Sequence, residues 1–309
     1  MSGAAERIRA KNIPEFEAIA SGHRGCQGCG EVLAMRLAMK AVGENMIVVN
    51  ATGCMEVITS PFPHTAWNVP WIHVAFENAG AVGSGVSAAI KALQRKGRYK
   101  NDDTKVIIVG GDGGTSDIGF QSLSGALERN HDFVYICFDN EAYMNTGIQR
   151  SSATPTGAWT TTSPIGAACE GKKDPKKDLV AIFANHGIPY VATATPAHHL
   201  DLMNKVRKAA NMPGPAFIHV FSPCPTGWKM PTSSSIDVCK TAVKSNLYPL
   251  FEIIDGKYVM GPINKKPIPV IEYLKSQGRF KHLSESQIEC IQYEVDKRYK
   301  QLIRWSEEE

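Results

Sequence analysis

The sequence lacks any apolar stretch close to the ~20 residues that a membrane-spanning helix needs. Its first residues lack the apolar core of a secretory signal peptide, so we expect a cytoplasmic protein without a membrane anchor. The charge is nearly balanced, with 34 basic and 30 acidic residues and a net charge of +4, which gives no ground for expecting nucleic-acid binding. There is no internal repeat and no low-complexity tract. At 43% hydrophobic over 309 residues, the chain can instead bury a sizeable core.

Closely spaced cysteines are also scarce. Of eight cysteines, only Cys26 and Cys29 form a C-x-x-C pair, in the segment GHRGCQGCG at residues 22–30. In a reducing compartment such a pair more often binds metal or acts in redox chemistry than forms a disulfide. Cys54 and Cys224 each follow a predicted strand, so four thiolates can meet at one edge of a sheet, which suits zinc or an iron–sulfur cluster.

Two of these cysteines stand alone and far apart in the sequence, which fits a zinc ribbon poorly. Taken singly, Cys54 and Cys224 are better explained as inert buried thiols. That explanation fits the remaining cysteines better, and these are Cys137, Cys169, Cys239 and Cys290.

Short β-branched runs alternate with stretches of helical spacing along most of the chain. The runs lie at residues 46–50, 105–109, 133–137, 190–192 and 216–220. Both faces of these runs are apolar, which predicts an α/β fold with a parallel sheet flanked by helices. Ligands of such folds bind at the carboxyl ends of the strands.

Composition changes after the last of these strands, from about Pro223. We therefore expect an N-terminal arm at residues 1–20, a main domain at 21–228, and a C-terminal extension at 229–309 that packs on the core or on another subunit. Within the extension, residues 283–304 have the pattern of an amphipathic helix, with Ser284 and Ser286 as candidate caps.

A glycine-rich turn, GGDGGTSDIG at residues 110–119, directly follows one predicted strand. It lacks the third glycine of a Rossmann fingerprint and the lysine of a Walker A loop. Its plain alternative is a tight strand-to-helix turn with a capping aspartate. Asp117, near its end, is predicted to cap the following helix.

Asp112 and Asn140 end two successive predicted strands, so both side chains should point into one crevice. A carboxylate and an amide oxygen, joined by a backbone carbonyl, suit Mg²⁺, which keeps further places for diphosphate oxygens and water. The glycines leave backbone N–H groups open to phosphate, and they are Gly111, Gly113 and Gly114.

A GDG followed 28 residues later by an asparagine resembles the thiamine diphosphate motif. With the cysteine segments, and with WIHVAFENAGAVGSG at residues 71–85 and DNEAYMNTGIQRS at 139–151, the chain resembles the beta subunits of pyruvate:ferredoxin oxidoreductases (pyruvate synthases), in the 2-oxoacid:ferredoxin oxidoreductase family. The resemblance implies the thiamine diphosphate-binding fold of the pyrophosphate type. It implies oxidative decarboxylation of pyruvate to acetyl-CoA with reversible reduction of ferredoxin.

The same resemblance implies roles for individual residues. Asp112, Asn140 and the carbonyl of Ala142 would hold Mg²⁺, Asn145 would lie beside the thiazolium and substrate, and Val57 would line the substrate pocket. The ligands of one 4Fe–4S cluster would be Cys26, Cys29, Cys54 and Cys224. The implied partners are alpha, gamma and delta-type subunits, ferredoxin, coenzyme A and a 2-oxoacid, and a partner subunit would supply the catalytic glutamate.

Three alternatives stay open. The chain can belong to the same family but act on oxalate or another 2-oxoacid. It can be a cluster-free thiamine-dependent decarboxylase or synthase, although such chains are usually much longer and the four cysteines would then have no role. A non-catalytic electron-transfer subunit would need the cluster but not Asp112 and Asn140.

Overall fold

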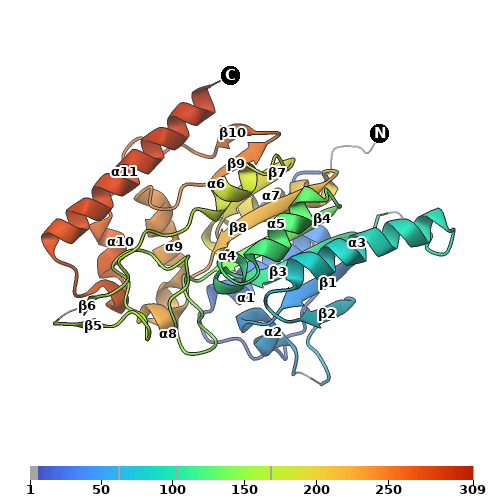
Figure 1. Ribbon diagram of the computed structural model, residues 1–309, viewed down its shortest axis with the longest axis horizontal. Coiled ribbons are helices and arrows are strands. Elements are labelled where there is room, and N and C mark those ends of the chain that lie inside the picture. Colours follow the sequence, from blue (N-terminus) through green and yellow to red (C-terminus); the bar gives the residue numbers. More distant parts are fainter. Residues whose placement is uncertain (1–5, 62, 102, 168, 309) are drawn as a thin grey trace.

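The computed structural model describes residues 6–61, 63–101, 103–167 and 169–308. Its main feature is an eight-stranded sheet in the order β10-β9-β7-β8-β4-β3-β1-β2, covered by helices on both faces (Figure 1). The predicted fold class is confirmed. Residues 1–5 of the predicted N-terminal arm and residue 309 of the predicted extension lie outside the described residues.

Six strands of the sheet pair in parallel, and they are β1 (Met46–Ala51), β2 (Trp71–Val74), β3 (Lys105–Gly111), β4 (Phe133–Asp139), β7 (Tyr190–Ala194) and β8 (Pro215–Phe221). The central strands β4 and β8 are buried along their whole length, because helices cover both of their faces. Their neighbour β3 is buried except at its ends. This explains why these segments are apolar runs and do not alternate between apolar and polar residues.

Two helical layers sandwich the sheet. On one face, α1 (Gly30–Val42) and α7 (His199–Asn211) pack together and share an apolar cluster with Ile107 and Val109 of β3. On the other face, α3 (Ala79–Arg95), α5 (Phe120–Glu128) and α6 (Leu179–Ala184) share a second cluster with Val106 and Ile108. Successive residues of one strand thus enter opposite cores, as the pleat of a β-strand requires.

The C-terminal part of the chain extends this sheet, which the sequence analysis did not predict. Strands β9 (Phe251–Ile254) and β10 (Lys257–Met260) form an antiparallel hairpin, and β9 pairs antiparallel with β7. The hairpin turns at Asp255 and Gly256, both with positive φ, as a tight two-residue Asp-Gly turn requires. Residues on both sides of residue 228 thus build one sheet. The division of the chain at this residue stays a prediction.

The final helix α11 (Glu285–Glu307) confirms the predicted amphipathic helix, and Ser284 is its N-cap in a capping box with Gln287. It contacts β10 at the sheet edge. Helices α9 (Ser235–Lys244) and α10 (Ile271–Lys275) help to form a third apolar cluster beside the sheet. The shorter elements are α2 (Cys54–Thr59), α4 (Asp112–Ser116), α8 (Pro225–Trp228), β5 (Ile165–Gly166) and β6 (Cys169–Glu170).

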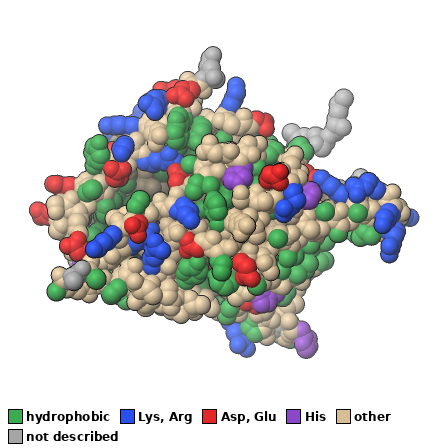
Figure 2. Space-filling model, viewed as in Figure 1, with side chains coloured by type: hydrophobic (Ala, Val, Ile, Leu, Met, Phe, Trp, Pro, Cys, Tyr) green, Lys and Arg blue, Asp and Glu red, His purple; other side chains and the backbone are tan. Residues whose placement is uncertain are grey.

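Over the described residues, no helix combines the length and apolarity that a membrane crossing needs. In Figure 1 the C-terminal end of α3 projects from the body of the molecule. Figure 2 shows Lys and Arg side chains gathered at this end, whereas acidic and basic side chains are interspersed over the rest of that face.

The small-residue stretch at the start of α3 allows close packing of this helix. A Cβ atom on Gly80 would lie 2.7 Å from the Cα of Leu123 and 2.8 Å from its backbone nitrogen, in α5. On Gly83 it would lie 2.1 Å from the Cδ1 of Ile108, in β3. Gly85 is exposed, and a Cβ there would meet nothing within 4 Å. Gly80 therefore sets the distance between α3 and α5.

We expect Gly80→Ala to lower the free energy of unfolding by about 1–3 kcal/mol, because the added methyl group meets backbone atoms that cannot rotate away. The matched variant Gly85→Ala, in the same helix, should instead raise it by about 0.5–1 kcal/mol, because alanine favours the helix over glycine. Urea unfolding of the purified chain measures both values. Equal effects of the two substitutions would contradict this packing.

Candidate active site

The predicted site residues follow adjacent strands of the sheet. Strands β8, β4, β3 and β1 are neighbours and run parallel, so their carboxyl ends meet at one edge. The residues that follow them or begin the next helix are Cys224 after β8, Asn140 after β4, Asp112 after β3 and Cys54 after β1. The last paired residues of β3 and β4 are Gly111 and Phe138. Those of β4 and β8 are Asp139 and Phe221, so the three strands end nearly level.

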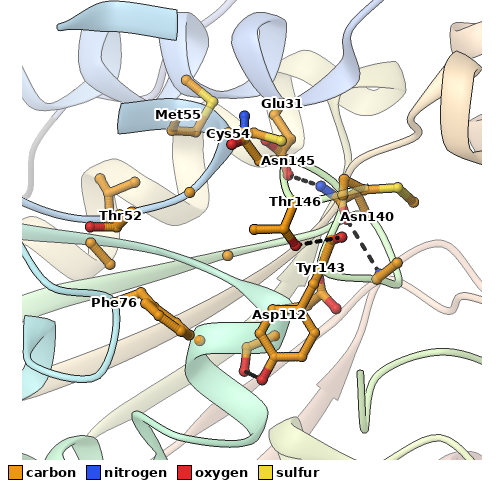
Figure 3. Close-up of a pocket in the computed structure, with 18 of the residues that line it drawn as sticks. Glu31, Thr52, Cys54, Met55, Phe76, Asp112, Asn140, Tyr143, Asn145 and Thr146 are labelled. Carbon is orange, nitrogen blue, oxygen red and sulfur yellow. Dashed lines mark hydrogen bonds between the residues drawn. The ribbon is translucent and has the colours of Figure 1, made fainter. Parts of the chain in front are cut away.

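A pocket of about 660 Å³, partly open to solvent, lies at this edge (Figure 3). Its lining includes many residues predicted from the sequence, namely Cys54, Gly111, Asp112, Gly113, Gly114, Asn140, Ala142 and Asn145. Val57 is not among the described residues that line it, and its side chain is 41% exposed on α2. The pocket lies at the carboxyl ends of parallel strands, where ligands of such folds bind.

Other residues of the lining were not predicted, and they include Glu31, Thr52, Met55, Phe76, Tyr143, Met144 and Thr146. Most of them are neighbours in sequence of the predicted residues. Glu31 had a possible signal, because it is an acidic residue in the first turn of the helix that directly follows the C-x-x-C pair. Its proximity to Asn140, however, comes from contacts between remote parts of the chain.

Asp112 begins α4 with its carboxylate buried, 1% exposed. Ser151 Oγ donates a hydrogen bond of 2.6 Å to its Oδ2. Burial, reinforced by the negative charge of Asp139, raises the pKa of Asp112 well above its usual value. A bound cation at this carboxylate would reverse that effect, so the environment of Asp112 fits a metal ligand.

Asn140 and Glu31 form a buried pair across the pocket. Asn140 Nδ2 donates a hydrogen bond of 2.5 Å to Glu31 Oε1, as Figure 3 shows. Burial raises the pKa of Glu31 to about 8. Because the amide nitrogen is held by Glu31, the amide oxygen of Asn140 faces the other way, where the Ala142 N–H lies 3.4 Å from it. This orientation leaves the Asn140 oxygen as an acceptor on the side of Ala142.

The glycines of the turn have different surroundings. A Cβ on Gly111 would meet nothing within 4 Å, so this position opens onto free space. On Gly113 a Cβ would lie 2.5 Å from the ring of Tyr143, so only glycine lets this ring approach α4. The Tyr143 hydroxyl then lies 3.0 Å from both the Gly113 carbonyl and Asp117 Oδ2, and these two oxygens share its one proton in a bifurcated hydrogen bond. The structure therefore requires glycine at Gly113, behind the pocket, whereas Gly111 faces open space at the pocket.

The prediction that Asp117 caps a helix is wrong. Helix α5 begins at Phe120 with Gly119 as its N-cap, and that cap makes no side-chain hydrogen bond. Asp117 accepts hydrogen bonds from Tyr143 Oη and from the backbone N–H of Ser152. It thereby holds the segment after Asn140 against α4.

The C-x-x-C segment packs against the end of β8. Cys29 is the N-cap of α1, and its N–H donates to the carbonyl of Cys26 at 3.1 Å. The next residue, Gly30, donates to the carbonyl of Pro223 at 3.1 Å, and a Cβ on it would lie 2.4 Å from the proline ring. Glycine at position 30 therefore brings Cys29 close to Cys224, which is the N-cap of α8.

Three of these thiols have raised pKa values. Burial, then the charge of Glu31, raises the pKa of Cys29 to about 12, and the same causes raise that of Cys54 further. Burial also raises the pKa of Cys224. Charges on the cysteines add to these shifts, from Cys224 on Cys29, from Cys29 and Cys224 on Cys54, and from Cys26 on Cys224. The four thiols are thus electrostatic neighbours.

The thiols do not form a closed metal site. In the part of the chain that the structure describes, no three Cys, His, Asp or Glu side chains are arranged to hold a metal ion. All four are free thiols, and only Cys54 is part of the pocket lining. Of the other cysteines, Cys137 and Cys239 are buried elsewhere, and Cys169 and Cys290 are exposed.

Comparisons with known proteins agree with this architecture. Residues 51–220 match the family described as thiamine pyrophosphate enzyme, C-terminal TPP binding domain. The chain is 53% identical to the pyruvate synthase subunit PorB of Methanocaldococcus jannaschii, over 94% of this chain and 98% of that one. It is 47% identical to the ketoisovalerate oxidoreductase subunit VorB of Pyrococcus abyssi, over 97% of this chain and 96% of that one.

Among solved structures, the 2-oxoglutarate:ferredoxin oxidoreductase of Magnetococcus marinus shares the fold, with a TM-score of 0.56 and 20% identity. The match covers 73% of this chain and 81% of that chain. The chain therefore belongs to the thiamine pyrophosphate enzymes and, within them, to the 2-oxoacid:ferredoxin oxidoreductase family that includes the pyruvate synthase subunits PorB.

Proposed function

We propose that this chain is the subunit that carries thiamine diphosphate and a 4Fe–4S cluster in a complex that oxidises pyruvate to acetyl-CoA and reduces ferredoxin. One observation carries the proposal: Cys54, a candidate cluster ligand, lines the same pocket as Asp112 and Asn140, the candidate magnesium ligands. A two-electron oxidation that ends on a one-electron carrier needs the two cofactors close together. The likeness to pyruvate synthase subunits supports the choice of reaction.

The candidate magnesium ligands are the carboxylate of Asp112, the amide oxygen of Asn140 and the backbone carbonyl of Ala142. Two observations support this choice. The carboxylate of Asp112 is buried and forms no ion pair with a cation among the described residues, and the amide of Asn140 is held by Glu31. All three are hard oxygen ligands of the kind that Mg²⁺ prefers. Gly111 would leave room for the diphosphate, and the backbone N–H groups of Gly113 and Gly114, at the start of α4, are the proposed donors to it.

Thiamine diphosphate would supply an electron sink for the carbanion left by decarboxylation. The amide of Asn145, in the pocket lining, is suited to hydrogen-bond the 2-oxo oxygen of the substrate. Val57 keeps its proposed role in the substrate pocket only if a partner subunit closes the site over α2. We also assign to partner subunits the catalytic glutamate and the groups that bind the substrate carboxylate.

Cys26, Cys29, Cys54 and Cys224 are the proposed ligands of the 4Fe–4S cluster. The raised thiol pKa values of Cys29, Cys54 and Cys224 support this assignment, because deprotonated sulfurs packed this closely need the positive charge of iron. Structural zinc fits less well, because the ligands come from segments at three separate places in the sequence.

The proposed complex contains alpha, gamma and delta-type subunits, and it acts in the cytoplasm with ferredoxin and coenzyme A. Within this chain we assign both cofactor sites to residues 21–228. Residues 1–20 form an arm, and residues 229–309 form an extension. A branched-chain 2-oxoacid is the second candidate substrate, favoured by the 47% identity to ketoisovalerate oxidoreductase subunits.

The magnesium site predicts the behaviour of Asp112→Asn. At thiamine diphosphate and Mg²⁺ concentrations ~100 times the Kd, the wild type should gain about 2.7 kcal/mol of unfolding free energy, and the variant should lose this gain. Without cofactors the variant should be as stable as the wild type, because it removes a buried carboxylate with a raised pKa. Asp237→Asn, at an exposed aspartate of α9, is the control. Chemical unfolding with and without cofactors measures this, and full cofactor stabilisation of Asp112→Asn would contradict the site.

The cluster predicts a contrast between two cysteines. Cys224→Ser should lose most of the bound iron and the visible absorbance that dithionite bleaches, while Cys290→Ser, at an exposed cysteine of α11, should keep both. Iron analysis and absorbance spectra of the purified complex provide the measurement. Zinc in place of iron in the wild type, or an intact cluster in Cys224→Ser, would show the assignment to be wrong.

The substrate assignment predicts that the complex reduces viologen with pyruvate at least ~10-fold more efficiently, in kcat/KM, than with 2-oxoisovalerate, because two additional methyl groups must fit the pocket. Turnover with pyruvate should depend on coenzyme A. Assays over a panel of 2-oxoacids, with and without coenzyme A, test this. Preference for 2-oxoisovalerate would favour the second candidate, and turnover of oxalate alone without coenzyme A would exclude both.

A further inference from the structure

We propose that Arg279, in the C-terminal region, is a positioning residue that holds residues 139–142, here called the metal-ligand loop, in the shape needed to bind magnesium. The proposal rests on the magnesium site proposed above. It assigns a role to a residue that is 138 positions away in sequence from its partner Glu141 and lies outside the pocket lining.

The loop has an unusual backbone at Glu141. This residue has a φ of +69°, in the left-handed region that non-glycine residues rarely adopt. Glu141 lies between Asn140 and Ala142, so its conformation sets the directions of the Asn140 side chain and the Ala142 carbonyl. Two backbone contacts hold it: its N–H donates to Asp139 Oδ1 at 2.8 Å, and its carbonyl accepts from Thr154 Oγ1 at 2.6 Å.

The side chain of Glu141 is buried and is held by two cations. Lys176 Nζ lies 2.7 Å from its Oε1, and Arg279 Nη2 lies 2.5 Å from its Oε2. Lys176 also pairs with the buried Asp139, at 2.5 Å from Oδ2. Without Arg279, Glu141 would keep only Lys176, which it shares with Asp139, whereas Asp139 also has His219 Nε2 at 3.0 Å from its Oδ2; a buried carboxylate that loses a partner is strongly unfavourable. Glu141 is then expected to move, and the flanking magnesium ligands with it.

Arg279 supports the loop by a second route, through Trp228. The guanidinium, on a residue only 2% exposed, stacks 4.0 Å from the centre of the Trp228 ring. Trp228 Nε1 in turn donates a hydrogen bond of 2.8 Å to the carbonyl of Asn140. Both the carboxylate of Glu141 and the carbonyl of Asn140 therefore depend on where one guanidinium lies.

The guanidinium itself is fixed by its own segment. Arg279 Nε donates to Gln277 Oε1 at 2.9 Å, and Nη2 donates to Tyr273 Oη at 3.2 Å. Its carbonyl accepts from the N–H of Trp159 at 3.0 Å. Lysine cannot reproduce this arrangement, because a single ammonium offers neither the planar stack nor donors on two sides.

The decisive experiment compares two Arg→Lys variants in the purified complex. R279K should bind Mn²⁺, used in place of Mg²⁺, about 10–100-fold more weakly than the wild type, as is usual when a group supporting a metal ligand is lost. The matched control is R298K, which alters another arginine–carboxylate pair of the C-terminal region, between Arg298 and Asp178 of the α6 N-cap. Its Mn²⁺ affinity should equal that of the wild type. Electron paramagnetic resonance of free Mn²⁺ measures binding without requiring turnover.

Two further measurements separate positioning from general stability. The KM for Mg²⁺ should rise in R279K, while kcat at saturating Mg²⁺ and thiamine diphosphate should stay near the wild-type value. Hydrogen exchange of backbone amides in residues 139–146 should be faster in R279K and unchanged in R298K. If R279K does not fold, E141Q replaces it, because glutamine keeps the size of the side chain and removes its charge; about tenfold weaker Mn²⁺ binding is then expected.

The possible outcomes are distinct. In one outcome the wild-type complex binds Mn²⁺ and thiamine diphosphate, and R279K binds them equally well (or E141Q does, where R279K does not fold). The role of Arg279 is then disproved and the proposed function stands. If the wild-type complex binds neither, the magnesium site itself is disproved, and the role of Arg279 with it. Weaker Mn²⁺ binding by R298K to the same extent would show a general effect of the C-terminal region and would also overturn the proposal.

Discussion

The parallel pairing of β8, β4, β3 and β1 is the constraint on which the site depends. Because the pairing fixes where each strand ends, it brings together Cys224, Asn140, Asp112 and Cys54 although they are far apart in sequence. Apolar clusters cover both faces of the sheet and pack its strands against the helices that flank them.

Much of this arrangement could be predicted because it follows from local patterns. Apolar runs identified the central strands, and strand ends placed Asp112 beside Asn140 in one pocket. The hairpin of β9 and β10 was missed although its Asp-Gly turn is a known signal, because prolines after it favoured an irregular segment. The position of the Val57 side chain could not be predicted from the sequence, because packing decides the orientation of the short helix α2. Met55, two residues earlier in this helix, lines the pocket, whereas Val57 does not.

The contacts that sequence could not predict join remote segments. Glu31 lies 109 positions from Asn140, and Arg279 lies 138 positions from Glu141. Nothing in the local sequence of either acid indicates its partner, because the contact exists only once α1 and the C-terminal region have packed on the sheet. These long-range contacts fix the orientations of the metal-ligand loop, whereas local patterns identify only which residues it contains.

The buried acids of the site differ in how their charge is balanced. The difference follows their position, behind the metal-ligand loop or in the pocket. Behind the loop, Asp139 and Glu141 are paired with Lys176 and Arg279, and the charge of Lys176 keeps the pKa of Asp139 below its usual value. In the pocket, Asp112 and Glu31 have no such partner among the described residues, and burial raises the pKa of both. The protein therefore neutralises the acids that shape the loop and leaves uncompensated those that face the cavity. A cation bound in the cavity would lower the pKa values of Asp112 and Glu31, because it favours the charged form of each acid.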